Sequence, residues 1–317
     1  MHETEMIVPP SIAFDADLRR QLARLASHHF LNTGSLIARV VDADLVTALT
    51  FLTISRSNVR ALTDDGQGAQ TFAALEAVPP DELRRGVSVY AVARDLAIPY
   101  ETVRRHVKKL RDKDVVETGP DGLTIPRRVY ASPNQIEAVA QNWELVRAFV
   151  ADAVRFGLIA PGPVAPLDAD TRRQAVRLSI AYFLDSLSVI GRALEQDALS
   201  AMVFLAIGRG NVGHFVHDPV TQVAYGSVAA IPPDHLRRPV SAYAVSRGLN
   251  LPYETTRRYG LKLIEQGWIE RSANGGLLVP ASVVARPSMI RGVVDLAETT
   301  QAFLAEMLAL GVPTDPL

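Results

Sequence analysis

Charged side chains gather on one face of the segment from Tyr100 to Leu110. Val103, Val107 and Leu110 recur at the spacing of a helix that buries one side. The opposite side holds the charged residues Glu101, Arg104, Arg105, Lys108 and Lys109. An Arg can bond guanine O6 and N7 together, a Glu can accept from cytosine N4, and Lys or Thr can hold phosphates. The pattern therefore predicts a helix that enters the major groove of DNA.

The same pattern returns further along the chain, in the segment from Tyr253 to Lys262. Its predicted exposed face holds Glu254, Arg257, Arg258 and Lys262. The lysines of the chain are Lys108, Lys109, Lys113 and Lys262, and all lie on or just after these two segments. A basic helix face is often simply solvated, but here it stands twice in the same context. Although the formal net charge is −1, we expect a local basic footprint.

These segments belong to an internal duplication, which defines the domain organisation. DADLRRQ (15–21) returns as DADTRRQ (168–174), and FLTISRSNV (51–59) returns as FLAIGRGNV (204–212). The offset is 153 residues, as from Glu101 to Glu254, and becomes 154 after one extra residue near Gly275. Such a repeat marks a recurring structural unit. We predict an N-terminal tail (1–13), a first repeat (14–160) and a second repeat (161–317), joined at the Pro-rich stretch 160–166.

Each repeat is predicted to begin and end with helices. In the first repeat, an amphipathic helix is expected from Asp15 to about His29, and a mostly apolar helix from about Asp44 to Val59. Turn formers at 63–68 follow. The last helix is capped by Ser132 and Pro133. Its apolar stripe is Ile136, Val139, Trp143, Val146 and Val150.

A compact motif is predicted between these helices. Ser88 is a good N-cap for a short helix, the stretch 97–99 makes a tight turn, and the charged helix starts near Tyr100. Strands at 115–118 and 123–125 flank a turn at 119–122. Helix, tight turn, helix and two-stranded ribbon is the order of a winged helix-turn-helix. The predicted fold class is therefore mainly α, with two tandem winged helix-turn-helix units whose flanking helices form an internal pseudo-dimer.

A family resemblance follows from these residues. The segment Pro99–Leu110 resembles the recognition helix of bacterial winged helix-turn-helix regulators, and its core Glu101-Thr-Val-Arg-Arg105 is similar to that of the catabolite-activator (Crp–Fnr) family. In that family the Glu and the final Arg read bases, which implies such a role for Glu101 and Arg105 and, through the repeat, for Glu254 and Arg258. The helical flanks resemble those of MarR-type regulators, whose terminal helices make a dimer.

The sequence departs from the Crp–Fnr pattern in two ways. That family commonly has a further Arg before the Glu, where Tyr100 and Tyr253 stand here, so the base preference is expected to differ. A cyclic-nucleotide-binding barrel is not evident in this sequence.

The predicted DNA-binding set joins both helices to two arginines after the first ribbon. Its members are Tyr100, Glu101, Thr102, Arg104, Arg105, Lys108, Lys109, Arg127, Arg128, Tyr253, Glu254, Thr255, Arg257, Arg258 and Lys262. Arg127 and Arg128 could reach a minor groove or phosphates. The pseudo-dimer should present the two helices about 34 Å apart to successive major grooves of an imperfect inverted repeat. Arg84-Arg85 and Arg237-Arg238 could touch the DNA backbone or lie on a solvated surface.

The two repeats differ within the charged helix. Thr256 and Gly260 stand where the first repeat has Val103 and Val107, and Gly inside a helix costs about 1 kcal/mol relative to Ala. Basic residues fall from six between Arg104 and Lys113 to three between Arg257 and Lys262. We therefore hypothesise that the first repeat contributes most of the affinity for DNA.

Other polar positions receive structural interpretations. His214 and His217 are adjacent potential metal ligands, but a surface turn is favoured because a metal site needs three or four ligands. His28-His29 is expected at a helix end, where His interacts favourably with the dipole. The matched pairs Arg56/Asn58 and Arg209/Asn211 end apolar helices, with a cap or an interhelical hydrogen bond as their expected role.

Several function classes are disfavoured. We find no phosphate-binding loop, nucleophile elbow or zinc-protease motif, so neither an enzyme nor a cofactor is predicted. The absence of cysteine excludes disulfides and thiolate metal sites. The most apolar runs, at 45–54 and 198–207, are too short to span a bilayer. The N-terminus does not resemble a secretory signal, so a cytoplasmic, bacterial protein is expected.

The sequence thus predicts a transcriptional regulator that binds double-stranded DNA. The alternatives are a tandem winged-helix scaffold for protein interactions, which the near-neutral charge favours, and a plasmid replication initiator, which also carries two winged helices. The apolar terminal helices allow a further homodimer. A cavity among the flanking helices could also bind a small-molecule effector.

Overall fold

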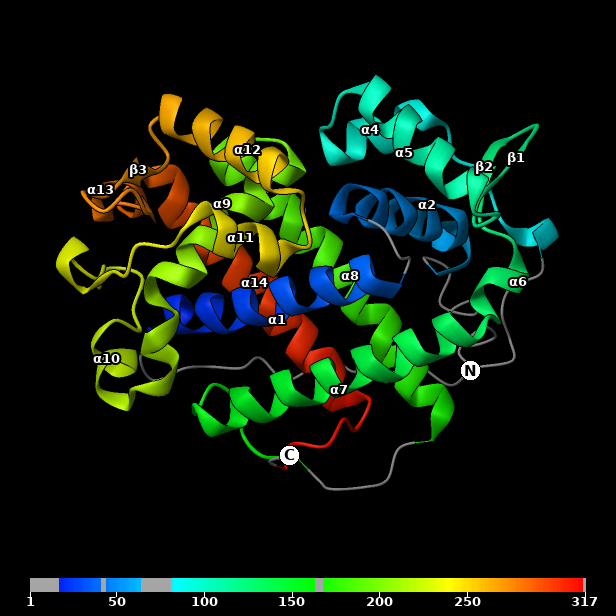
Figure 1. Cartoon of the computed structure of the whole chain (residues 1–317). Helices are drawn as coiled ribbons and strands as arrows, with labels where there is room; N and C mark the ends of the chain where they lie inside the picture. Colours follow the sequence, from blue (N-terminus) through cyan, green and yellow to red (C-terminus); the bar gives the residue numbers. More distant parts are fainter. Residues whose placement is uncertain (1–16, 41–43, 64–80, 163–167, 316–317) are drawn as a thin grey trace.

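The computed structural model describes residues 17–40, 44–63, 81–162 and 168–315, and the protein is mainly α-helical (Figure 1). The expected N-terminal tail, the turn formers at 64–68 and the junction residues 163–166 lie outside the described residues.

The same series of elements occurs twice along the chain. The first half contains α1 (Arg19–Val40), α2 (Leu45–Thr63), the 3-10 turn η1 (Asp81–Leu83), α4 (Val89–Leu96), α5 (Tyr100–Asp112), β1 (Glu117–Gly119), β2 (Gly122–Thr124), α6 (Arg127–Tyr130) and α7 (Pro133–Arg155). The second half contains α8 (Ala169–Leu194), α9 (Ala198–Val212), η2 (Gly213–His217), α10 (Pro219–Ala224), η3 (Asp234–Leu236), α11 (Ala242–Leu249), α12 (Tyr253–Glu265), β3 (Glu270–Arg271), β4 (Leu277–Leu278), α13 (Ala281–Val284) and α14 (Pro287–Ala309). With the offset of the repeat, α2, η1, α4, α5, β1, α6 and α7 begin at residues equivalent to the starts of α9, η3, α11, α12, β3, α13 and α14, whereas α8 begins three residues earlier than α1 and β4 one residue later than β2. The sequence repeat is therefore also a structural repeat over these elements.

Local signals set the helix–turn–helix of each half. The Ser88 hydroxyl accepts from the Ala91 N–H at the start of α4, and Ser241 does the same for Ala244 at α11. The turn that follows α4 contains Ala97 in the left-handed region at φ 52°, where a non-Gly residue costs about 1–2 kcal/mol. Asn250 holds the equivalent place at φ 49° and tolerates it better. The predicted cap and tight turn are therefore confirmed.

A two-stranded antiparallel ribbon follows each helix–turn–helix. In the first half Glu117 pairs with Thr124, and in the second Glu270 pairs with Leu278. The first strand begins two residues later than predicted, because the N–H of Val115 still donates to the carbonyl oxygen of Leu110 in α5 at 3.0 Å. An isolated bridge joins the residue before each N-cap serine, Val87 or Val240, to the returning strand.

One asparagine in each half ties the ribbon to the apolar second helix. Asn58 donates through Nδ2 to the carbonyl oxygens of Arg85 and Leu123 at 2.8 and 2.9 Å, and its Oδ1 accepts from the Ile125 N–H at 2.9 Å. Asn211 makes the equivalent three bonds, to Arg238, Leu277 and Val279. Both asparagines are buried. The role of the asparagine is therefore structural, as expected, but it is a three-way clasp between helix, loop and strand instead of a helix cap or an interhelical hydrogen bond.

Helix α1 is longer than predicted and continues to Val40. Its apolar face extends past the expected end through Phe30, Leu31 and Leu36, all of which are buried. His28 and His29 therefore lie in the middle of the helix, and the expected helix-end position for them was wrong. Ile136, placed on the buried stripe of α7 by its spacing, is 52% exposed because it lies in the first turn of that helix.

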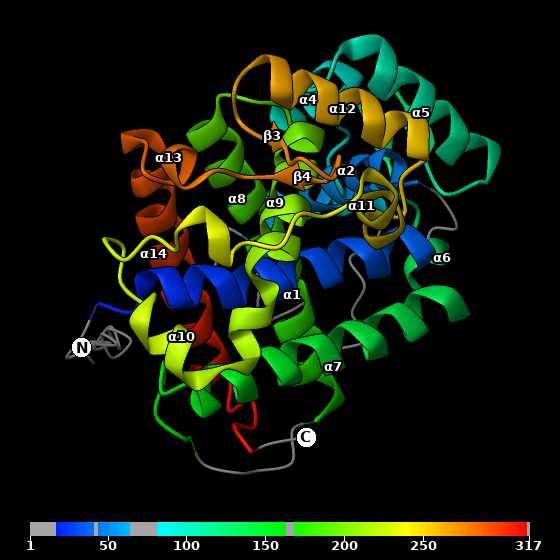
Figure 2. The same cartoon turned by 60° about the vertical axis from the view of Figure 1, so that its left-hand side comes forward.

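The helices that flank the motifs form one frame. Helix α1 packs against α7 of its own half and α14 of the other, and α8 packs against α14 and α7. The apolar stripes on which the homodimer expectation rests are thus largely covered within the chain, and the homodimer stays a prediction. Figure 2 shows α1 running across this frame below the helix–turn–helix units.

The amino-terminal part of α1 lies on the second half of the chain. Arg24 donates to the carbonyl oxygen of Tyr225 at 2.8 Å, and the N–H of Gln21 donates to that of Gly226 at 3.1 Å. Helix α1 also contacts α9 and α11. Helix α8 contacts α2 in the first half. The first helix of each half therefore contacts the other half as well as its own, and the two halves interlock.

Four aromatic rings join the halves at the frame. His29 stacks on Phe149 with 4.6 Å between ring centroids, and Tyr182 stacks on Phe303 at 4.4 Å. The cross-distances between the two stacks are 6.1–6.2 Å. Burial lowers the pKa of His29 to about 4, so that this imidazole is neutral at pH 7.

One segment, Ala198–Val216, is long and apolar enough to cross a membrane by length and composition, with mean hydropathy 1.3 and half of it buried. This segment comprises α9 and most of η2, and it is longer than the apolar run at 198–207 that was identified from the sequence. Its contacts with α1, α8, α11 and α12 are those of a core helix.

Candidate nucleic-acid interface

The two charged helices, α5 and α12, lie at the same end of the molecule. Both views show them there, with the frame helices α1 and α7 at the other end (Figures 1 and 2). The two ribbons flank this end on opposite sides in Figure 1. One surface therefore carries both helix–turn–helix units.

The buried and exposed faces of α5 are those that its spacing predicts. Val103, Val107 and Leu110 are buried, and α5 packs against α2 and α4. Helix α12 buries Thr256, Gly260 and Leu263 against α9 and α11. The predicted residues that the structure leaves exposed are Tyr100, Glu101, Arg104, Arg105, Lys108, Lys109, Arg127, Arg128, Tyr253, Glu254, Arg257 and Arg258, and Lys262 is half-buried. Thr102 and Thr255 are half-buried.

Each charged helix holds its glutamate with an arginine one turn later. Arg104 Nε donates to Glu101 Oε2 at 2.9 Å, and Arg257 Nε donates to Glu254 Oε2 at 2.9 Å. The Arg257 guanidinium lowers the pKa of the Glu254 carboxyl. An ionised carboxylate accepts hydrogen bonds only, so Glu254 is held as an acceptor, and Glu101 accepts from Arg104 in the same arrangement.

Two of the predicted phosphate-binding lysines make ion pairs inside the chain. Lys109 Nζ lies 2.8 Å from Asp44 Oδ2, and Lys262 Nζ lies 2.6 Å from Asp197 Oδ2. Both aspartates also accept an N–H in the first turn of the supporting helix, from Thr47 and Ser200. These lysines therefore fasten the charged helix to α2 or α9. Lys108 pairs with Asp112 on its own helix at 2.7 Å.

The arginines after the first ribbon lie on α6 and do not belong to the charged helix. Arg128 Nη1 lies 2.6 Å from Glu117 Oε1 on β1, and its Nη2 donates to the Asp114 carbonyl at 3.2 Å. The backbone N–H of Arg127 donates to Asp81 Oδ1 at 2.9 Å. In the second half Ala281 and Ser282 hold these positions, so any contact of this arginine pair with DNA is confined to the first half.

Each arginine pair that precedes a motif has a buried inner member and an exposed outer member. Arg84 and Arg237 are buried, whereas Arg85 and Arg238 are exposed. Arg84 donates to the Ile125 carbonyl and lies over the Tyr130 ring at 4.6 Å. Arg237 donates to the Pro232 carbonyl at 2.9 Å. Both expectations, a DNA contact or a solvated surface, were thus wrong for the inner members.

Sequence reasoning missed two exposed tyrosines at the start of the first motif helix. Tyr90 on α4 is 68% exposed, and its equivalent Tyr243 on α11 is 63% exposed. Tyr100 and Tyr253 are exposed as well. The signal was present in the matched strings SVYAV and SAYAV, where an aromatic residue occupies a polar-facing position of an amphipathic helix twice.

Within the described ranges, no group of three His, Asp or Glu residues is placed to hold a metal ion. Comparison with known proteins adds no relative: no family model, no curated protein and no solved structure matches this chain.

Proposed function

We propose that this protein is a sequence-specific double-stranded DNA-binding transcriptional regulator built from two tandem winged helix-turn-helix units. The observation that carries the proposal is the repeated set Tyr-Glu-Thr-x-Arg-Arg on α5 and α12, whose Tyr, Glu and Arg side chains are exposed at one end of the molecule (Figure 1). A helix of this kind fits the major groove, and its amino-terminal residues reach base edges.

The roles of the side chains follow from their chemistry. Glu101 and Glu254 are held as acceptors and suit the N4 amino group of cytosine, whereas Arg105 and Arg258 suit guanine O6 and N7. The exposed tyrosines at the helix starts and the half-buried Thr102 and Thr255 suit phosphate oxygens, which fix register without reading sequence. We assign Lys109 and Lys262 to the support of the helices.

The ion pairs at this end of the molecule affect how strongly DNA binding should depend on phosphate neutralisation. Several basic groups at this end are paired with carboxylates of the same chain, as in Arg104–Glu101 and Lys108–Asp112. We expect the affinity to depend on base contacts as much as on phosphate neutralisation. Each phosphate that is neutralised should still contribute about −0.9 to the slope of log K against log salt.

The test is selection of binding sites from fragmented genomic DNA by the full chain, followed by titration of the best site against salt. Enrichment of a two-part site with about ten base pairs between centres, and an affinity that falls with salt, support the proposal. Arg105→Ala should lose the selected site, while Ser57→Ala, on α2 and outside the charged helices, should keep it. Absence of enrichment with weak binding even at low salt would overturn it.

A protein-interaction scaffold is the second candidate, and the exposed tyrosines Tyr90, Tyr100, Tyr243 and Tyr253 favour it. Tyrosines of this kind are enriched in protein interfaces, and the formal net charge is only −1. A scaffold would bind a protein partner with little response to salt and would enrich no DNA site. If selected sites came from a replication origin instead of promoters, a replication initiator would replace the regulator.

A further inference from the structure

The residues proposed to read bases are the same in both charged helices. Each helix carries the set Tyr-Glu-Thr-x-Arg-Arg. Arg104 holds Glu101 as Arg257 holds Glu254, with 2.9 Å between nitrogen and oxygen in both. Two such helices suit the same bases. These residues alone therefore give the protein no means to distinguish the two ends of an inverted repeat.

The last turns of the charged helices lead to opposite sides of the molecule. Strand β1 begins five residues after the end of α5, and β3 begins five residues after the end of α12. The two ribbons lie on opposite sides of the end that carries these helices (Figure 1). We call residues 108–128 of the first half and their equivalents, 261–282, the outer edges.

The outer edge of the first half is basic. Its exposed cations are Lys108, Arg111, Lys113, Arg127 and Arg128. Lys108 pairs with Asp112 at 2.7 Å and Arg128 pairs with Glu117 at 2.6 Å, but all four side chains are more than half exposed. Exposed ion pairs of this kind contribute little to stability, so these cations are available to a phosphate.

The outer edge of the second half has lost these cations. Their equivalents are Leu261, Ile264, Gln266, Ala281 and Ser282. One exposed cation is gained there, Arg271, where the first half has Thr118. From Tyr100 to Tyr130 the first half has eight basic and five acidic residues, whereas the equivalent stretch, 253–284, has four and three. The excess of positive charge is thus larger in the first half.

Tyr130 fixes the helix that carries two of the first-half cations. Its hydroxyl lies 2.8 Å from Ser55 Oγ on α2, and the Arg84 guanidinium lies over its ring at 4.6 Å. Tyr130 is the last residue of α6. These contacts therefore hold Arg127 and Arg128 in place against the body of the first half.

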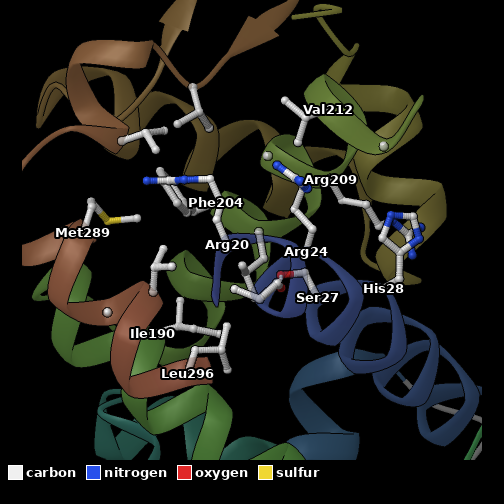
Figure 3. A pocket seen from close by; sticks show the side chains of 18 of the residues that line it. Arg20, Arg24, Ser27, His28, Ile190, Phe204, Arg209, Val212, Met289 and Leu296 are labelled. Carbon is white, nitrogen blue, oxygen red and sulfur yellow. Dashed lines mark hydrogen bonds between the residues drawn. The ribbon is translucent and has the colours of Figure 1, made fainter. Parts of the chain in front are cut away.

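The equivalent place in the second half is a cavity of about 150 Å³ (Figure 3). Val284 and Gly208 stand at the positions of Tyr130 and Ser55, and both line this cavity. Arg237, the equivalent of the arginine over the Tyr130 ring, lines it as well. Helix α13 thus lacks both the pair of arginines and the aromatic ring that fixes α6.

Resting on the proposed DNA-binding function, we propose that the chain binds its inverted repeat in one fixed orientation. The cations of the first outer edge contact DNA beyond the bases that α5 reads. These contacts are strongest on an A·T-rich flank, where a narrow minor groove makes the potential more negative. The second outer edge makes few such contacts and accepts any flank. The preferred operator is therefore two like half-sites with an A·T-rich flank on one side, and the first half of the chain lies at that side.

The probe is the selected site, made symmetric in its two half-sites and placed between an A·T-rich and a G·C-rich flank. The chain contains no cysteine, so a single introduced cysteine can carry an iron chelate that cleaves nearby DNA. Pro120→Cys and Ala273→Cys place the label at equivalent exposed turns of the two ribbons. The label on Pro120→Cys should cleave the A·T-rich side at least about tenfold more than the other, as expected for one charge-assisted hydrogen bond. The label on Ala273→Cys should cleave the G·C-rich side.

Variants of the labelled Pro120→Cys chain identify the cations responsible. Lys108→Leu/Arg111→Ile/Lys113→Gln and Arg127→Ala/Arg128→Ser each copy the second half into the first. Both should still bind the site, with cleavage of the two sides more nearly equal. Arg155→Gln, which removes an exposed cation of the frame helix α7, is the control and should leave the ratio unchanged.

The outcomes separate this proposal from the DNA-binding function on which it rests. Binding with equal cleavage of both sides by each label would overturn the fixed orientation and leave DNA binding intact. A preference that persists in both copied variants would overturn the assignment to these cations. Absence of binding to any selected site would overturn the function itself, and the orientation with it.

Discussion

His29 and Tyr182 occupy equivalent positions in the two halves, and their ring centroids lie 6.1 Å apart in the cluster that joins those halves. Each ring stacks on the equivalent phenylalanine, Phe149 or Phe303. The Tyr182 hydroxyl bonds to Thr300 Oγ1 at 2.8 Å, whereas His29 Nε2 lies 3.3 Å from Ser179 Oγ. The interface is thus symmetric in shape, but its histidine side can take up a proton in acid, because burial lowers the pKa of His29 to about 4.

The pKa of His29 predicts an acid-sensitive fold. Above pH 6.5 the imidazole is neutral in both the folded and the unfolded chain. Between pH 6.5 and about 4 the unfolded chain binds a proton that the folded chain excludes, so the free energy of unfolding should fall as the pH falls. The loss should reach about 3 kcal/mol for this residue, measured by urea unfolding at pH 7 and pH 4.5.

His29→Phe keeps a stacking ring and removes the proton site. It should flatten the pH dependence in this window, leaving the part that comes from His106, whose pKa burial also lowers to about 4. An unchanged pH dependence in the variant would contradict the assignment.

The asparagine clasp predicts a large and local loss of stability. Asn58→Ala would leave two carbonyl oxygens and the Ile125 N–H without this partner, and should lower the free energy of unfolding by about 2–4 kcal/mol. Asn211→Ala should cost a similar amount. Ser57→Ala, on the same helix, is the control and should stay within about 0.5 kcal/mol of the wild type. An effect of Asn58→Ala as small as the control would show that the ribbon does not depend on the clasp.

Helix α12 can be strengthened at the positions where it departs from α5. A Cβ at Gly260 would lie 3.8 Å from Leu277, an ordinary contact, so Gly260→Ala should stabilise the protein by about 1 kcal/mol. Within the part of the chain that the structure describes, the buried Thr256 hydroxyl has no hydrogen-bond partner. Thr256→Val, the residue found in α5, should stabilise by about 1 kcal/mol or more. A lower Tm in either variant would refute the corresponding account.

The two charged helices should contribute unequally to DNA binding. If α5 provides most of the affinity for the selected site, Arg105→Ala should weaken binding by about 1–3 kcal/mol, and Arg258→Ala should weaken it less. Fluorescence anisotropy on one labelled site, at fixed salt, measures both. Equal losses would refute the hypothesis of unequal halves while leaving DNA binding itself intact.

The sequence predicted the elements whose signals are local. The Ser88 cap, the turn at Ala97 and the start of α5 at Tyr100 depend on a few neighbouring residues, and each was placed correctly. The length of α1 was not, because the burial of Phe30 and Leu36 depends on elements far along the chain. The exposed face of α5 follows from its period and was predicted as well.

The ion pairs and burial at the candidate site also depend on long-range contacts, which the sequence did not predict. From spacing alone, Lys109 and Lys262 were predicted to contact phosphates. The aspartates with which they form ion pairs, Asp44 and Asp197, lie 65 residues earlier in each half. The burial of Arg84 beside Tyr130 likewise depends on a long-range contact. The substitutions that open the cavity are visible in the repeat, but only the fold brings Gly208, Val284 and Arg237 to one place.

The contacts of α1 and α8 with both halves make the dimer-like frame unimolecular. A homodimer of separate chains dissociates on dilution, whereas here the second half is always supplied at the effective concentration set by the linker. A homodimer also repeats every mutation on both sides of its axis, and this chain does not. One half can therefore keep the Tyr130 ring packed in its interior while the other leaves the equivalent place open. The single chain thus combines two different halves, as a heterodimer does with two separate chains.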